Sequence, residues 1–129
     1  MSTFKQVIVM RTDLGMNAGK VGSQAAHAAM LILLNRMIRG QGFSKTISDW
    51  VSERSGENHP GWHWGDMTKI VVAVDSLEEL NRIELEAKAL LCPVHAVYDN
   101  TLQAKTCIAI GPDFIQIIDD VTGKLPLFR

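Results

Sequence analysis

The sequence is poor in cysteine, in tyrosine and in net charge. Its 129 residues include two cysteines and one tyrosine, and the formal charge is −1. Cys92 and Cys107 form no CxxC pair, and a chain of this size does not need a disulfide for stability. We therefore expect both to be reduced thiols. The balanced charge argues against a protein that coats nucleic acid through bulk electrostatics.

Long hydrophobic runs are also missing. No apolar stretch is long enough to span a bilayer, and residues 1–4 do not begin a secretion signal. We therefore expect no membrane contact and a cytoplasmic location. The length and the hydrophobic content of 47% suit one core, which predicts a single domain over residues 1–129.

The charge that is present is divided unevenly along the chain. Residues 1–69 carry 8 Lys and Arg against 5 Asp and Glu, whereas residues 70–129 carry 5 against 9. This division leaves room for a basic surface on the N-terminal half. Ordinary scatter over a solvated surface explains it at least as well.

Hydrophobic periodicity predicts an alternation of strands and helices. Short apolar runs indicate buried strands, and apolar stripes at helical spacing between cap residues indicate helices. The predicted strands cover residues 5–11, 68–74, 93–99 and 105–111, and the predicted helices cover residues 17–39, 44–56, 76–90 and 113–123.

The connection between the last two strands predicts their direction. Residues 100–104 are too few for a crossover, so these strands should run antiparallel and the sheet should be mixed. Helices alternate with the other strands, which is typical of an α/β fold. The expected fold class is a three-layer α/β/α domain with a four-stranded mixed sheet.

Polar residues interrupt the small-sided run "LGMNAGKVGSQAAHAA" at residues 14–29. Lys20, Gln24 and His27 are spaced i, i+4 and i+7, which places them within about 60° on one face of a helix. Lys20 lies in the first turn, where unpaired N–H groups attract an anion or an oxyanion. The spacing of "GMNAGKV" does not fit a P-loop. The alternative is that neighbouring backbone satisfies Gln24 and His27 while Lys20 is solvated.

Topology favours a site at the start of this helix. Ligands of such sheets bind beyond the carboxyl ends of the parallel strands, and Lys20 follows the first strand. Asp99 ends the third strand, and an antiparallel fourth strand would return Lys105 and Thr106 to the same edge. We therefore expect an ammonium, a carboxylate and a hydroxyl at one rim, with Gln24 and His27 leading away from it.

The two ends of the chain resemble one known family. "KQVIVMRTDLGMNAGKVGSQAAHAA" is similar to the opening strand, loop and helix of the type-2 peptidyl-tRNA hydrolases of archaea and eukaryotes, and "AKTCIAIGP" and "IIDDVTGKLPLF" are similar to their last strand and closing helix. The resemblance implies hydrolysis of the ester between a peptide, or an N-blocked aminoacyl group, and the terminal ribose of tRNA. It also implies that no metal or other cofactor takes part.

The resemblance also implies that Lys20, Gln24, His27, Asp99 and Thr106 match functional positions of the family's site. In a mechanism that suits these residues, Asp99 orients and partly deprotonates a water while Lys20, with Thr106 or a backbone N–H, stabilises the oxyanion. The expected catalytic residues are Lys20, Asp99 and Thr106, and the expected substrate-binding residues are Gln24, His27, Thr101 and Lys105.

One segment departs from the family pattern. After its aspartate the family usually reads Ala-Gly-x-Thr-Gln and then a glycine-containing loop, whereas this chain has the shorter "DNTLQAKT". Thr101 and Gln103 stand where the loop threonine and glutamine would be. The alternative function is therefore a non-catalytic relative that binds a ligand, a tRNA or a protein partner through the same rim.

The segment "NHPGWHWGD" carries two histidines and two tryptophans. Pro60 and Gly61 separate His59 from His63, and no cysteine or paired carboxylate completes a set of metal ligands, so we expect no metal site. Trp62 and Trp64 suit stacking on the unpaired bases of a tRNA acceptor end, or packing on the domain or on a second subunit. We favour packing, and a homodimer stays open.

Overall fold

A computed structural model describes residues 2–129 and contains a mixed sheet of four strands in the order β2-β1-β4-β3. β1 and β2 are parallel, and β4 is antiparallel to both β1 and β3. This arrangement confirms the predicted sheet. The elements are β1 (Phe4–Arg11), α1 (Ala18–Ile38), α2 (Lys45–Ser52), β2 (Lys69–Val74), α3 (Leu77–Ala89), β3 (Val94–Asp99), β4 (Ala104–Phe114) and α4 (Ile115–Thr122).

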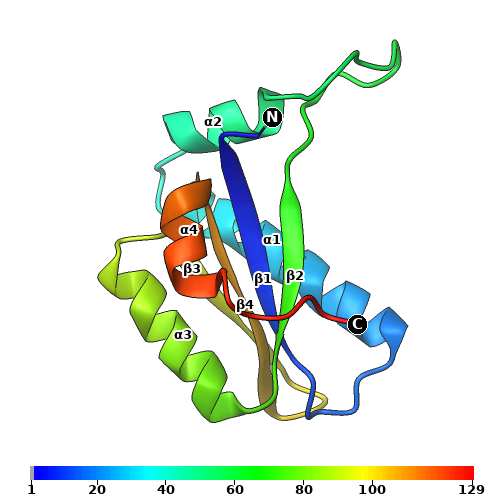
Figure 1. Cartoon of the computed structure of the whole chain (residues 1–129), viewed down its shortest axis with the longest axis vertical. Helices are drawn as coiled ribbons and strands as arrows, with labels where there is room; N and C mark the ends of the chain where they lie inside the picture. The colour runs from blue at the N-terminus through cyan, green and yellow to red at the C-terminus, as the bar shows by residue number, and fades with distance from the viewer. Residues whose placement is uncertain (1) are drawn as a thin grey trace.

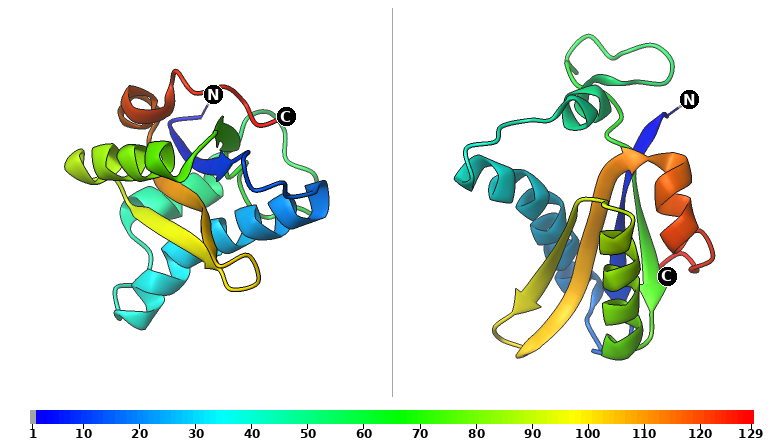
Figure 2. Two further views of the ribbon diagram at one scale, coloured as in Figure 1. Left: turned by 90° about the horizontal axis from the view of Figure 1, so that it is seen from below. Right: turned by 90° about the vertical axis from the view of Figure 1, so that its left-hand side faces the viewer.

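Helices cover both faces of the sheet, as Figures 1 and 2 show. On one face, Ala28 and Ile32 of α1 pack against Ile8 and Met10 of β1. On the other face, α3 and α4 pack over a second core cluster that includes Leu80 of α3. The three predicted layers are therefore present. The helix α2 lies at one end of the sheet.

Local capping explains where three of the helices begin. The side-chain oxygens of Asn17, Ser44 and Ser76 each accept a backbone N–H three residues later, at 2.9, 3.2 and 3.1 Å. These bonds satisfy donors that the first helical turn leaves unpaired. The helix starts predicted from these cap residues are confirmed.

Two predicted boundaries are wrong because contacts distant in sequence override the local pattern. The second helix ends at Ser52 and not at residue 56, since Glu53 is extended and accepts the Thr3 N–H at 2.5 Å. The last helix begins at Ile115 and not at residue 113. Residues 113 and 114 instead continue β4, because they pair with β1.

The prediction that the second strand is buried is confirmed only in part. β2 lies at an edge of the sheet, and only Val72 and Val74 among its residues are buried. The central strand β1 is buried along seven of its eight residues. The same kind of apolar run therefore serves an edge strand and a central strand, which periodicity alone does not distinguish.

A β-bulge in β4 decides which side chains face α1. The partner of Val97 is Cys107 and the partner of Tyr98 is Lys105, so Thr106 is the extra residue. The Thr106 hydroxyl reaches Gln24 of α1, and Cys107 belongs to the core cluster beneath the same helix. A bulge permits two successive side chains on one face, where regular pleating would alternate them.

The tryptophan segment between α2 and β2 extends away from the sheet (Figures 1 and 2). The exposed fractions of Trp62 and Trp64 are 47% and 52%, so the tryptophans are not packed into the domain. Their packing on a second subunit stays a prediction. They precede the amino end of β2, whereas Lys20 follows the carboxyl end of the parallel strand β1. The tryptophans and Lys20 therefore lie at opposite ends of the sheet.

None of the helices within residues 2–129 is both long and apolar enough to span a membrane.

Candidate active site

A lysine and a carboxylate meet where β1, β3 and α1 converge. Lys20 Nζ lies 2.6 Å from Asp99 Oδ2, and the two side chains are 31% and 10% exposed. Lys20 is in the first turn of α1, and Asp99 is the last residue of β3. The structure thus brings together an ammonium and a carboxylate that are far apart in the sequence and leaves the ammonium accessible.

The Gln24 amide connects this pair to β4. Its Nε2 donates to Asp99 Oδ2 at 3.0 Å, and its Oε1 accepts the Thr106 hydroxyl proton at 2.6 Å. Gln24 is 1% exposed and Thr106 is 0% exposed. Because both are buried, neither reaches the open surface in this arrangement. Gln24 and Thr106 therefore support Asp99 from behind.

The turn after β3 supplies a further donor to the carboxylate. The Leu102 N–H donates to Asp99 Oδ1 at 2.8 Å. The Lys20 ammonium, and then this N–H, hold the pKa of Asp99 below its ordinary value. Oδ2 has two partners and Oδ1 has one, so Oδ1 keeps more capacity to accept a bond from a bound water.

Cys107 lies under the site, and its thiol is not a reactive group. Its thiol donates to the Gln24 carbonyl oxygen at 3.5 Å, and burial raises the pKa of this thiol to about 11. A thiol with such a pKa is a poor source of thiolate near neutral pH. Cys92 is also buried and free. Both cysteines are therefore thiols, as the sequence predicts.

Three residues predicted for the site lie outside this cluster. His27 is exposed, with its Nε2 3.4 Å from the Ser23 hydroxyl. Thr101 is exposed in the turn that follows Asp99. Lys105 Nζ donates to Asn81 Oδ1 at 2.6 Å and to Glu84 Oε1, both on α3. The prediction that Lys105 joins Thr106 at the rim is wrong for its side chain.

An arginine that was not predicted for the catalytic centre stabilises the same region. Arg11 Nη1 donates to the Lys105 carbonyl oxygen at 3.1 Å, and its Nε and Nη2 bind the two oxygens of Asp13 at 2.9 and 2.7 Å. These bonds tie the loop before α1 to the start of β4. The available signal was the position of Arg11, the last residue of a buried strand and two residues before an aspartate.

Within residues 2–129, no group of three or more His, Cys, Asp and Glu side chains is arranged to hold a metal ion.

The fold and this centre define a small α/β protein in which a buried amide donates to a carboxylate, and that carboxylate pairs with an accessible lysine. The sequence profile described as peptidyl-tRNA hydrolase PTH2 matches residues 4–128, so the chain belongs to that family. The resemblance seen at the two ends of the sequence is therefore confirmed, and it extends over nearly the whole chain.

Similar proteins agree with this assignment. A Sulfurisphaera tokodaii protein named peptidyl-tRNA hydrolase is 37% identical over 95% of this chain and 97% of its own. A Methanopyrus kandleri protein of the same name is 34% identical over 98% and 99%. The solved structure of an Agrobacterium tumefaciens C58 protein of unknown function covers both chains completely with a TM-score of 0.61. Its 13% identity supports the fold alone.

Replacing the buried amide should cost both stability and activity. Gln24→Leu removes the oxygen that accepts from the Thr106 hydroxyl and one of the two donors to Asp99 Oδ2, so we expect the free energy of unfolding to fall by about 1–3 kcal/mol. Denaturant titration measures this change, and kcat/KM should fall with it. Gln116→Leu makes the same replacement at an exposed position of α4. Equal stability of the two variants would show that the Gln24 bonds contribute nothing.

Proposed function

We propose that this chain hydrolyses the ester bond between a peptide, or an N-blocked aminoacyl group, and the 3′-terminal ribose of tRNA. The observation that carries the proposal is the Lys20–Asp99 pair, held by Gln24 in a chain of the peptidyl-tRNA hydrolase family. Peptidyl-tRNA forms where ribosomes translate, so we place the reaction in the cytoplasm.

Asp99 is proposed to hold the attacking water. A water that donates to Oδ1 is oriented with a lone pair free to attack the ester carbonyl. The low pKa of Asp99 keeps the carboxylate charged, so it accepts this bond at neutral pH. Its weak basicity means that the proton moves to Oδ1 only as the carbon–oxygen bond forms.

Lys20 is proposed to stabilise the negative charge that develops on the carbonyl oxygen. Its ammonium has three protons, and the ion pair with Asp99 occupies one direction. A neighbouring oxyanion can therefore accept from Nζ without breaking the pair. Such preorganised electrostatic contacts are commonly the largest single contribution to acyl transfer.

The tetrahedral intermediate then collapses. The carbonyl double bond re-forms, the bond to the ribose 3′-oxygen breaks, and the proton held by Asp99 passes to that leaving oxygen. The products are tRNA and the free peptide, whose new carboxylic acid keeps the second proton of the water and releases it to solvent as the acid ionises. Gln24 and Thr106 act as positioning residues in this scheme, because both are buried and bonded to one another. We propose Thr101, exposed beside Asp99, as a contact with the substrate.

Release of labelled acyl group from N-acetylaminoacyl-tRNA tests the proposal. Purified protein should release it well above a catalyst-free blank, with multiple turnovers. Unblocked aminoacyl-tRNA, treated in parallel, reports whether the activity depends on the blocked amine. A folded protein that releases no more than the blank would contradict the proposal and favour the non-catalytic alternative.

A further inference from the structure

Two hollows lie in the space between α1 and β3, the two elements that carry Gln24 and Asp99. The nearer one, about 230 Å3 in volume, is lined by His27, Met30, Leu31, Leu34, Val97 and Tyr98. The farther one, about 250 Å3, lies between the end of α1, the start of α2 and the start of β3. Together with the Lys20–Asp99 pair, the hollows form a path that we call the α1–β3 groove.

The periodicity of both elements places the nearer hollow in line with the Lys20–Asp99 pair. On β3, Val97 faces α1 within the core cluster and Asp99 contacts Gln24, so alternate residues of the strand point toward the helix. On α1, Leu31 follows Gln24 by seven residues and therefore lies on the same face. The face of α1 that carries Lys20 and Gln24 at the reacting centre therefore also carries Leu31, which lines the nearer hollow.

The nearer hollow is apolar and open. Met30, Leu34 and Tyr98 are 55%, 38% and 58% exposed, and none of the six lining side chains is a lysine or an arginine. A nucleic-acid strand carries one negative charge per nucleotide and would find no cation here. An apolar amino-acid side chain would bury hydrocarbon against these residues.

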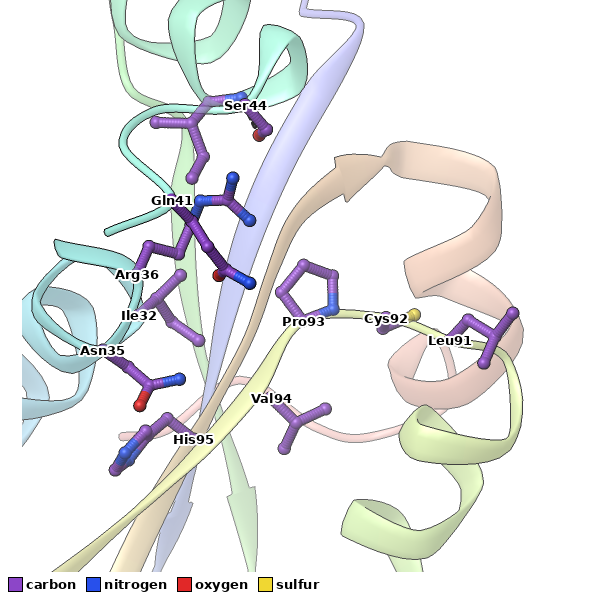
Figure 3. Close-up of a pocket in the computed structure, with 11 residues that line it drawn as sticks. Ile32, Asn35, Arg36, Gln41, Ser44, Leu91, Cys92, Pro93, Val94 and His95 are labelled. Carbon is purple, nitrogen blue, oxygen red and sulfur yellow. Dashed lines mark hydrogen bonds between the residues drawn. The ribbon is translucent and has the colours of Figure 1, made fainter. Parts of the chain in front are cut away.

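The farther hollow has a different character. Figure 3 shows Asn35, Arg36 and Gln41 at the end of α1 near Pro93 and His95 of the β3 segment. Side-chain amides offer both donors and acceptors, which suits the alternating N–H and C=O groups of a peptide backbone. Its lining contains no Asp or Glu.

The edge position of β3 adds main-chain partners. β3 is the last strand in the order β2-β1-β4-β3, so no further strand formed by residues 2–129 pairs with its outer side. Exposed strand edges bind extended peptides through main-chain hydrogen bonds, while hollows accept alternate side chains. β3 has six residues. At about 3.3 Å per residue the groove beside it is about 20 Å long and suits about six peptide residues.

We propose that the α1–β3 groove binds the peptide of peptidyl-tRNA, with the side chain of the ester-linked residue in the nearer hollow. This inference rests on the proposed function and extends it to the acyl half of the substrate. The tRNA half of the substrate then extends from the ester in the opposite direction, past the start of α1. The groove makes the protein selective for longer acyl groups.

Two uncleavable analogues test the groove. Each is a CCA trinucleotide whose 3′ end carries, through an amide, either N-acetylalanine or an N-acetylated hexapeptide that ends in leucine. The protein should bind the hexapeptide analogue at least about tenfold more tightly, because that analogue buries additional apolar surface. Calorimetry or fluorescence titration gives both dissociation constants.

Leu34→Arg tests where the selectivity arises. The change places a long cation in the groove, so it should weaken binding of the hexapeptide analogue more than binding of the acetylalanine analogue and bring the ratio of the two dissociation constants close to one. Leu85→Arg makes the same change at a site 68% exposed on α3, beyond the other face of the sheet. That control should keep the ratio.

Three results would overturn the proposal. These are a ratio near one in the wild type, a failure of both analogues to bind, and a Leu34→Arg variant that changes both affinities equally. The last result would place the CCA end in the groove. Hydrolysis of N-acetylaminoacyl-tRNA without a length effect overturns the groove alone. A length effect on binding without hydrolysis overturns the proposed reaction alone.

Discussion

Asp99→Asn should lower kcat for hydrolysis of N-acetylaminoacyl-tRNA by about 10²- to 10⁴-fold while the affinity for tRNA changes little. Asparagine keeps the size of the side chain but loses the charge that accepts the water proton. It also presents an N–H group either to Leu102 or to the Lys20 and Gln24 donors, so part of the loss reflects a less ordered site. Single-turnover kinetics separates the chemical step from binding.

The pH dependence of the wild type gives an independent measure of the same residue. Because the pKa of Asp99 lies below its ordinary value, the carboxylate stays ionised as the pH falls through the usual aspartate range. The acid limb of kcat/KM should therefore lie below that range. In the Asp99→Asn variant this limb should be absent.

Asp120→Asn is the matched control for this prediction. Asp120 is exposed on α4, on the opposite face of the sheet from α1, and the change removes the same charge. It should leave kcat within about twofold of the wild type. Thermal denaturation checks that both variants are folded. Equal rates for folded Asp99→Asn and Asp120→Asn would exclude Asp99 from the reaction.

The predictions from sequence succeeded where the determining contacts are local. Asn17 and Ser76 predict the starts of α1 and α3, because an N-cap hydrogen bond joins residues only three apart. The short turn between β3 and β4 forces an antiparallel pair. The boundaries that failed depend on contacts distant in sequence, the Thr3–Glu53 hydrogen bond at the end of α2 and pairing with β1 at the end of β4, which the local pattern does not encode.

The site also has features that the sequence predicts and one that it does not predict. Helical spacing puts Lys20 and Gln24 on one face, and topology brings Asp99 to that face. The pleat sends adjacent residues of a strand to opposite faces, so Lys105 turns to α3 while Thr106 turns to α1. The burial of Thr106 behind Gln24 depends on the bulge in β4, and no residue type in the sequence marks that bulge.

Lys20→Met should lower kcat by about 10²- to 10³-fold, because the ammonium is the proposed contact for the oxyanion. Methionine retains an unbranched side chain and good helix propensity, so α1 should stay intact. The loss of the ammonium should also raise the pKa of Asp99 toward its ordinary value, since Lys20 is the main cause of the lowering. The acid limb of kcat/KM should therefore move to higher pH.

Lys45→Met provides the matched control for this change. Lys45 also lies in the first turn of a helix and pairs with an aspartate, Asp49, at 2.7 Å, but it is 87% exposed on α2. Its loss should leave both kcat and the acid limb unchanged, because exposed ion pairs contribute little. A shift of the limb in Lys45→Met equal to that in Lys20→Met would show a general charge effect.

The double variant tests whether the two groups serve one transition state. If Asp99 positions the water and Lys20 receives the charge that its attack creates, each contact loses most of its value when the other is removed. Lys20→Met with Asp99→Asn should then be little slower than the slower single variant. Independent roles would multiply the two losses, to about 10⁴-fold or more at the sizes expected here. A fully multiplicative loss in folded protein would therefore contradict a shared transition state, even if both single variants were slow.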